Sequence, residues 1–65
     1  MTPIVLRVRA LREARHWSQN ELARRAGIAQ SIVSRLEAGK VTSLHLETLE
    51  RLAKAFGVKP RTLIG

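Results

Sequence analysis

Residues 23–33, ARRAGIAQSIV, are the stretch that decides the fold of this chain. Ala23, Gly27 and Val33 follow one another in it at offsets of four and six. A small residue fits where two helix backbones cross, glycine tolerates the left-handed backbone of a tight turn, and a branched residue fills the contact between helices. A plain helical hairpin does not require these three residue types in this register. The spacing therefore predicts a helix-turn-helix motif over about residues 18–38.

The second helix of this motif, expected over about residues 29–38, has an unusual outward face. Its apolar residues fall within one arc of about 140° on a helical wheel; they are Ile28, Ala29, Ile32, Val33 and Leu36. The opposite arc carries hydroxyls, an amide and a guanidinium in place of the Lys and Glu of an ordinary exposed helix. Amides pair with adenine edges, guanidinium groups with guanine, and hydroxyls with either. The candidates for reading DNA bases are Gln30, Ser31, Ser34 and Arg35.

The composition of the chain indicates one small basic domain. Its 65 residues include 12 Lys and Arg but five Glu and no Asp, which gives a formal net charge of +7. Such a charge attracts polyanions such as nucleic acid, although it is also typical of a merely soluble surface. No cysteine is present, and the apolar run Ile4-Val5-Leu6 ends at Arg7, far short of a membrane span. We therefore expect a cytoplasmic protein without a membrane segment.

Capping residues set the expected ends of the first helices. The first helix should end near Arg15, and the second should start at Ser18, because Ser18 and Glu21 have the spacing of a capping box. Gly27 and Gly39 are expected to end the second and third helices, since glycine adopts the left-handed conformation found there.

The second half of the chain continues the helical pattern. A fourth helix is expected to start near residues 43–45 and to end at Gly57, and Pro60 can begin a short fifth helix that carries Leu63 and Ile64. No segment alternates polar and apolar residues over a useful length, so no sheet is expected. The sequence predicts an all-α fold in a single domain over residues 1–65.

Two longer stretches, WSQNELARRAGIAQSIVSRLEAGK at residues 17–40 and LETLERLAKAFGV at residues 46–58, carry a family resemblance. Together they resemble the lambda-repressor-like helix-turn-helix family, the Cro and XRE type of bacterial and phage regulators. The resemblance extends from about Val8 to Ile64. It implies a compact five-helix bundle whose third helix lies in the DNA major groove, with Gln30, Ser31, Ser34 and Arg35 facing base edges.

The same resemblance implies roles for residues outside the third helix. Positions at the start of the second helix and in the loop after the third would meet the DNA backbone, helped at the helix start by exposed N–H groups. These phosphate candidates are Ser18, Gln19, Lys40, Thr42 and Ser43. Arg12 and Glu37 match a pair that commonly forms an ion pair between the first and third helices, so we expect them to be structural. Ile32, at the edge of the apolar arc, is expected to be partly core, with contact to a thymine methyl group or sugar as the alternative.

Several positions depart from the usual pattern of the family. Position 29 is often Ser or Thr there and caps the third helix, whereas Ala29 accepts no such hydrogen bond, a loss of about 1 kcal/mol. His16 occupies a position where glycine is usual, so the first helix is expected to end with a strained His or by another route. Trp17 stands where an aliphatic residue is usual, and we expect it to fill the core beside the motif.

Catalysis and metal binding find little support in the sequence. His16 and His45 have no partner at metal-ligand spacing, and no Ser-His-acid arrangement is present, so we expect neither an enzyme nor a cofactor. Five further arginines could contact phosphates, but most of them are expected to form a solvated basic surface that steers encounter with DNA. They are Arg7, Arg9, Arg15, Arg24 and Arg25.

The sequence thus predicts a transcriptional regulator, most often a repressor in this family, that binds specific double-stranded DNA. One such domain reaches few base pairs, so a homodimer on an inverted repeat with half-sites roughly 34 Å apart is expected. Residues 59–65 are the expected place of self-association. Two alternatives stay open: a protein-interaction module, such as an antitoxin or a polymerase adaptor, and an enzyme that continues beyond Gly65.

Overall fold

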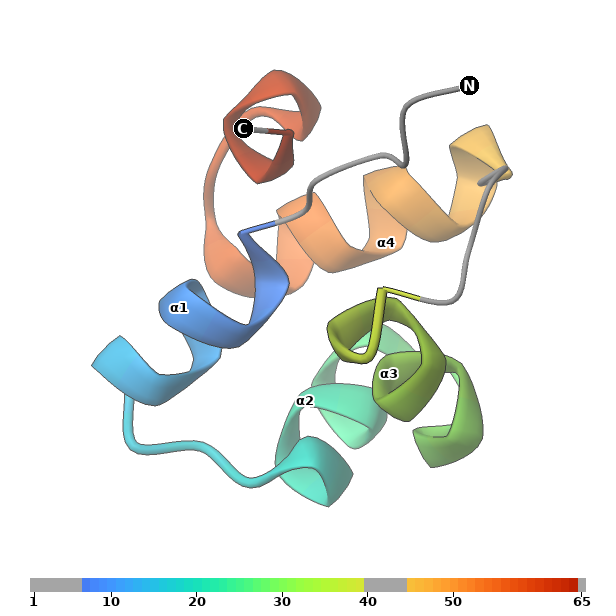
Figure 1. Ribbon diagram of the computed structural model, residues 1–65. Coiled ribbons are helices and arrows are strands. Elements are labelled where there is room, and N and C mark those ends of the chain that lie inside the picture. The colour runs from blue at the N-terminus through green and yellow to red at the C-terminus, as the bar shows by residue number, and fades with distance from the viewer. Residues whose placement is uncertain (1–6, 40–44, 65) are drawn as a thin grey trace.

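Four α-helices and one turn of 3-10 helix succeed one another in the computed structural model, which describes residues 7–39 and 45–64 (Figure 1). The elements are α1 (Val8–Ala14), α2 (Gln19–Ala26), α3 (Gln30–Glu37), α4 (Leu46–Phe56) and η1 (Pro60–Leu63). Because these two ranges contain no β-strand, the all-α prediction is confirmed for them. The phosphate candidates Lys40, Thr42 and Ser43, like the apolar run at residues 4–6, lie outside the described residues.

The predicted fifth helix is not an α-helix. Pro60 does begin a helical turn, but its hydrogen bonds run from Thr62 N–H to the Lys59 carbonyl at 2.9 Å and from Ile64 N–H to the Arg61 carbonyl at 3.2 Å. Bonds that span three residues define the tighter 3-10 geometry, which is usual in such short pieces. The five-helix count is therefore not confirmed, although the element still places Leu63 fully in the core.

The capping residues set the helix ends largely as expected. The Ser18 hydroxyl accepts a hydrogen bond from the Glu21 N–H at 3.0 Å and so caps α2. The Glu21 carboxylate forms ion pairs with Arg24 and Arg25, so only the Ser18 half of the capping box is present. Gly27 ends α2 with a φ of 69°, in the left-handed region that glycine adopts without steric cost.

The end of α1 is strained at His16, which is one of the two outcomes expected from the sequence. His16 has a φ of 58° and is the one non-glycine residue with a positive φ among the described residues. Two backbone N–H groups after the helix, on His16 and Trp17, return to the carbonyls of Glu13 and Arg12. The Arg12 guanidinium also donates to the Trp17 carbonyl at 2.7 Å. This conformation is held by hydrogen bonds that offset the steric cost of a side chain in the left-handed region.

The core lies where α2 crosses α3 and where α4 and η1 close over them. Ala23 and Val33 are buried at the crossing, which confirms the packing expected of the helix-turn-helix. Leu52 and Phe56 of α4 and Leu63 of η1 cover the other side of the same core. The remaining fully buried or nearly buried members are Val8, Leu22, Ala26, Leu36 and Ala53.

Two residues assigned to the apolar arc of the third helix are exposed. Ala29 precedes α3 as its N-cap, with extended backbone at φ −73° and ψ 143°, so a helical wheel that includes it places it wrongly. Ile32 does lie in α3, but 36% of its surface is exposed, which makes it peripheral to the core. The helix is anchored by Val33 and Leu36 instead.

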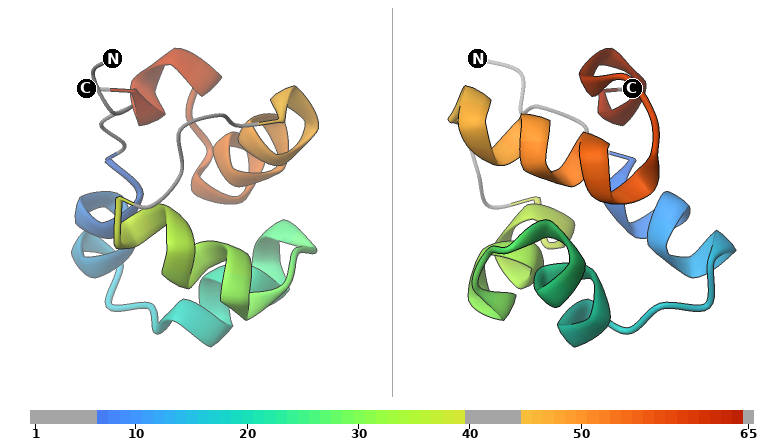
Figure 2. Two further views of the ribbon diagram at one scale, coloured as in Figure 1. Left: turned by 45° about the vertical axis from the view of Figure 1, so that its right-hand side comes forward. Right: turned by 180° about the vertical axis from the view of Figure 1, so that it is seen from behind.

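The arrangement of the helices leaves α3 on one side of the molecule. In the left view of Figure 2, α3 crosses the front of the molecule with α2 behind and below it. Seen from behind, in the right view, α2 and α4 are nearest the viewer. The Arg7 N–H donates to the Leu63 carbonyl at 2.7 Å and thereby joins the two ends of the described chain. The fold thus presents α3 outward on a base formed by α2, α1 and α4.

Candidate nucleic-acid interface

The outward face of α3 is polar and open. Val33 and Leu36 turn inward and are buried, and this fixes which side of the eight-residue helix is exposed. All four candidate base-reading residues are exposed on the remaining side: Gln30, Ser31, Ser34 and Arg35. Within the described residues, no side-chain hydrogen bond engages the last three of them. Their donors and acceptors are therefore available to a partner that approaches α3.

A network of side-chain hydrogen bonds connects α3 with α2 and α1. Arg12 donates to both carboxylate oxygens of Glu37, from Nε to Oε2 at 2.7 Å and from Nη2 to Oε1 at 2.9 Å. Gln19 Nε2 donates to Glu37 Oε1 at 3.2 Å, and Gln30 Nε2 donates to Gln19 Oε1 at 2.7 Å. The first residue of α3 is thus linked to the last residue of α3 through the first residue of α2.

This network fixes the direction of the Gln30 amide. An ionised carboxylate only accepts hydrogen bonds, so Glu37 orients the NH2 group of Gln19 toward itself and leaves the Gln19 oxygen as the acceptor for Gln30. Gln30 must then donate with one N–H and keeps its oxygen and its second N–H free. An acceptor and a donor side by side match N6 and N7 of adenine in the major groove. The arrangement is therefore suited to reading adenine.

The Arg12–Glu37 ion pair is largely shielded from solvent, with 13% and 5% of the two side chains exposed. Burial alone would raise the pKa of the Glu37 carboxyl. Hydrogen bonds from Arg12 and Gln19, together with the charges of Arg12 and Arg9, outweigh burial and hold that pKa below its ordinary value. The hydrogen bond to Glu37 raises the pKa of Arg12 in turn. The pair is fully charged at neutral pH and serves as a structural link between α1 and α3.

The phosphate candidates at the start of α2 are only partly free. Ser18 is exposed, and its oxygen accepts from the Glu21 N–H, which leaves its hydroxyl hydrogen to donate elsewhere. Gln19 is partly buried, and its amide already contacts Glu37 and Gln30, which leaves one N–H. Gln19 lies beside the start of α3, because Gln30 bonds directly to it.

Arg15 does not belong to the solvated basic surface to which the sequence assigned it. Its guanidinium donates to the Phe56 carbonyl at 2.7 Å and to the Leu11 carbonyl at 3.0 Å. It also lies 5.0 Å from the Phe56 ring centre and 5.7 Å from that of Trp17, and these two rings stack on each other. Arg25 lies over the Trp17 ring at 4.5 Å. Trp17 fills the edge of the core as expected, and Arg15 is structural.

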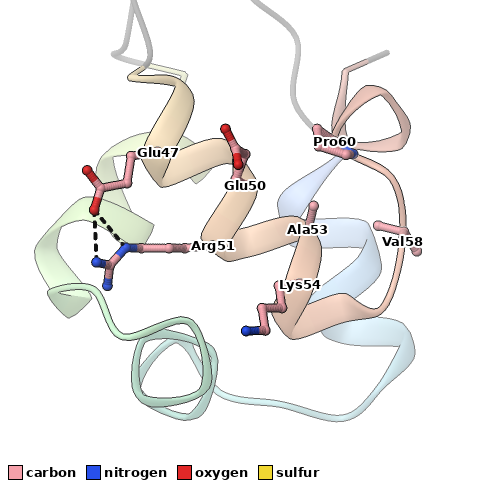
Figure 3. Close-up of a pocket in the computed structure, with 7 residues that line it drawn as sticks. All are labelled: Glu47, Glu50, Arg51, Ala53, Lys54, Val58 and Pro60. Atoms are coloured by element: carbon pink, nitrogen blue, oxygen red, sulfur yellow. Dashed lines mark hydrogen bonds and ion pairs between the residues drawn. The ribbon is translucent and has the colours of Figure 1, made fainter.

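Arg51 is a contact that sequence reasoning missed. Its guanidinium donates to the Gly27 carbonyl, in the turn between α2 and α3. It also donates to Glu47 one helical turn earlier (Figure 3). The spacing of Glu47 and Arg51 on a helix is visible in the sequence and predicts an ion pair. The contact with Gly27 joins positions 24 residues apart and has no local signal.

Other kinds of site find no support in the described residues. They contain no group of three His, Cys, Asp or Glu side chains that could hold a metal ion. None of their helices is long and apolar enough to cross a membrane.

The chain is similar to known proteins that carry a helix-turn-helix. A family model with that description matches residues 8–63. An uncharacterized HTH-type transcriptional regulator from Coxiella burnetii is 38% identical over 65 residues, which are all of this chain and 30% of that protein. The chain therefore spans less than a third of the length of this curated relative.

Two solved structures show the same fold. The restriction-modification controller protein C.AhdI from Aeromonas hydrophila superposes with a TM-score of 0.79 at 36% identity, over 86% of this chain and 83% of that chain. SinR from Bacillus subtilis, described as the master regulator for biofilm formation and solved in complex with DNA, gives a TM-score of 0.81 at 30% identity. That match covers 86% of this chain and 89% of the SinR chain.

Proposed function

Since the chain belongs to the Cro/XRE-type helix-turn-helix family of DNA-binding transcriptional regulators, we propose that it reads specific double-stranded DNA by inserting α3 into the major groove. The observation that carries the proposal is the outward face of α3. Four side chains suited to base edges are exposed there, while the inward face anchors the helix in the core. Repression of transcription is the outcome we propose for such binding.

Each exposed side chain of α3 is proposed to contact a different base. Gln30, with its amide direction set by Gln19, reads adenine, and Arg35 donates two parallel hydrogen bonds to guanine O6 and N7. Ser31 and Ser34 accept from or donate to neighbouring bases. Ile32 stands at the border of this face and can contact a thymine methyl group.

Contacts with the phosphate backbone set the register of α3 in the groove. At the start of α2, the Ser18 hydroxyl and the free Gln19 N–H serve this purpose, next to the backbone N–H groups of the first turn. Lys40, Thr42 and Ser43 are proposed to do the same beyond α3. The net charge of +7 adds long-range attraction that weakens with salt and does not depend on sequence.

A homodimer on an inverted repeat is the proposed binding unit, acting in the cytoplasm. The eight residues of α3 present few base contacts, and two half-sites roughly 34 Å apart on one face of the duplex would double them. We also propose a protein partner as a second ligand. The relative from Coxiella burnetii is more than three times as long as this chain, which leaves room in such a protein for a part that binds other proteins.

Selection of bound duplexes from a random pool tests the proposal. We expect a recurring motif, arranged as an inverted repeat, that contains A·T and G·C pairs at fixed positions. Recovery of duplexes without any preferred sequence would contradict it and would favour the protein-interaction module. A single unrepeated motif would keep base reading but overturn the homodimer.

A further inference from the structure

A hydrogen bond from α4 holds the turn that leads into α3. Arg51 Nη1 donates to the Gly27 carbonyl at 3.2 Å. The same guanidinium is held in place by Glu47 Oε1, which accepts from Nε at 3.2 Å and from Nη2 at 2.8 Å. Figure 3 shows the Arg51 side chain leaving α4 toward the turn, with Glu47 beside it. Carbonyls at the end of a helix lack partners within the helix, and Arg51 supplies one for Gly27.

Within the turn, the Gly27 and Ile28 N–H groups donate to the carbonyls of Arg24 and Ala23, which closes the end of α2 but does not cap the start of α3. Ala29, the N-cap of α3, has no side-chain oxygen, so the first N–H groups of α3 receive no side-chain cap. Within the described residues, no other hydrogen bond connects α4 with residues 27–29. The direction in which α3 leaves the turn therefore depends on the Arg51 contact, on the hydrogen bond between Gln30 and Gln19, and on the packing of Val33 and Leu36.

The Arg51 side chain lies at the border of two surface grooves. It borders one groove with Ile28, Ile32 and Leu46 and another with Arg24 and Lys54. None of the four exposed polar residues of α3 borders either groove. Arg51 thus contacts the turn and none of the four polar base-reading candidates, although Ile32 at the edge of their face borders the same groove.

We propose that Arg51 is a positioning residue for DNA recognition: it holds the Gly27 turn so that the first residues of α3 enter the groove in the correct register. The inference rests on the proposed function of α3. It also gives Gly27 a second constraint, because a Cβ atom at that position would lie 3.2 Å from Arg51 Nη1 in addition to requiring a φ of 69°. An exposed Glu–Arg pair on one helix stabilises the fold little by itself, so loss of the pair should affect the turn more than overall stability.

Three variants separate positioning from simple charge. Arg51→Lys keeps the charge but lacks the planar fork that reaches Glu47 and Gly27 together. Arg51→Met removes charge and contact. Lys54→Met is the matched control, because it removes one exposed cation from the next turn of α4 and leaves the Arg51 contacts intact.

Affinities for the selected site and for a random duplex, measured at one salt concentration, give the first readout. We expect both Arg51 variants to lose about five- to tenfold in the ratio of specific to non-specific affinity, whereas Lys54→Met keeps the wild-type ratio. Melting temperatures should change little in all three. A wild-type ratio in Arg51→Lys, or parallel losses in Arg51→Met and Lys54→Met, would overturn the inference.

Hydrogen exchange without DNA gives the second readout, which does not depend on the proposed function. The Ile32 N–H donates to the Ala29 carbonyl in the first turn of α3. We expect this amide to exchange faster in both Arg51 variants than in Lys54→Met. Unchanged exchange would show that Arg51 does not hold the turn, even if the wild type proved to be sequence-specific. Conversely, if the wild type selected no DNA sequence, the proposed function would be refuted. The exchange rate of the Ile32 amide would then still show whether Arg51 holds the turn.

Discussion

The starts of α2 and α3 are built in opposite ways. Ser18 caps α2 through a hydrogen bond three residues along the chain, so that helix start is fixed by its own sequence. Ala29 offers α3 no cap, and this start is held by Gln19 through Gln30 and by Arg51 through Gly27. The helix proposed to read DNA is therefore positioned by residues distant in sequence. The orientation of α3 can therefore be altered by substitutions at Gln19 or Arg51 that leave the packing of α2 against α3 unchanged.

The largest effect should come from breaking the ion pair behind this network. Glu37→Gln leaves the shielded Arg12 without its charge partner and should lower the free energy of unfolding by about 3 kcal/mol in urea titrations. Replacing both residues, as Arg12→Met with Glu37→Leu, should restore part of that loss. Glu13→Gln, which removes the partner of Arg9 in an exposed pair, is the control and should change little. Equal effects of Glu37→Gln and Glu13→Gln would contradict the structural role of the pair.

The same pair predicts a pH dependence. Because the folded pKa of Glu37 lies below its ordinary value, its contribution to stability is complete above the unfolded pKa, about 4.3, and is lost as the pH falls through the folded pKa. Urea unfolding at a series of acidic pH values should show a steeper loss of stability in the wild type than in Glu37→Gln. Identical slopes would mean that Glu37 is not stabilised in its charged form.

The base-reading and phosphate roles can be separated by two alanine variants. Arg35→Ala should cost about 1–3 kcal/mol on the selected site and relax the preference at one base pair. Lys40→Ala should weaken binding to all sequences alike and flatten the salt dependence. Titrations against sites with single base-pair changes distinguish the two. A uniform loss across all sites in both variants would contradict this division.

Removing the cap of α2 and adding one to α3 tests whether the two helix starts are held in different ways. Ser18→Ala should destabilise the fold by about 1 kcal/mol, and Ala29→Ser should stabilise it by a similar amount, since the Ala29 backbone already has the extended conformation of an N-cap. Urea unfolding of both variants measures the difference. No gain from Ala29→Ser would mean that the start of α3 is already satisfied by its distant contacts.

The smallest effect is expected at the end of α1. His16→Gly should stabilise the protein by about 0.5 kcal/mol, because the φ of 58° is strained for a side chain and open to glycine. Gly57→Ala should destabilise the protein, because a φ of 72° is strained for a side chain even though the added methyl group would meet nothing beyond its chain neighbours. Thermal melting of the pair reports both changes, and a loss of stability in His16→Gly would refute the strain.

Local signals account for what the sequence predicted well. The cap at Ser18 and the turn at Gly27 depend on residues a few positions apart, and the exposure of Gln30 and Arg35 follows from the periodicity that buries Val33. Ala29 was placed wrongly because a helical wheel treats every residue as helical, whereas Ala29 is the N-cap. The last element is a 3-10 turn because its four residues are too few for a stable α-helix. The sequence could show neither why Arg15 is structural nor that Arg51 reaches Gly27.

The central claim, that the exposed face of α3 meets DNA, is tested most directly by backbone amide NMR during titration with the selected duplex. The account predicts the largest shifts at Gln30–Arg35 and at Gln19, with small shifts at Glu50 and Lys54 on the exposed surface of α4. Largest shifts on α4, with α3 unchanged, would contradict it.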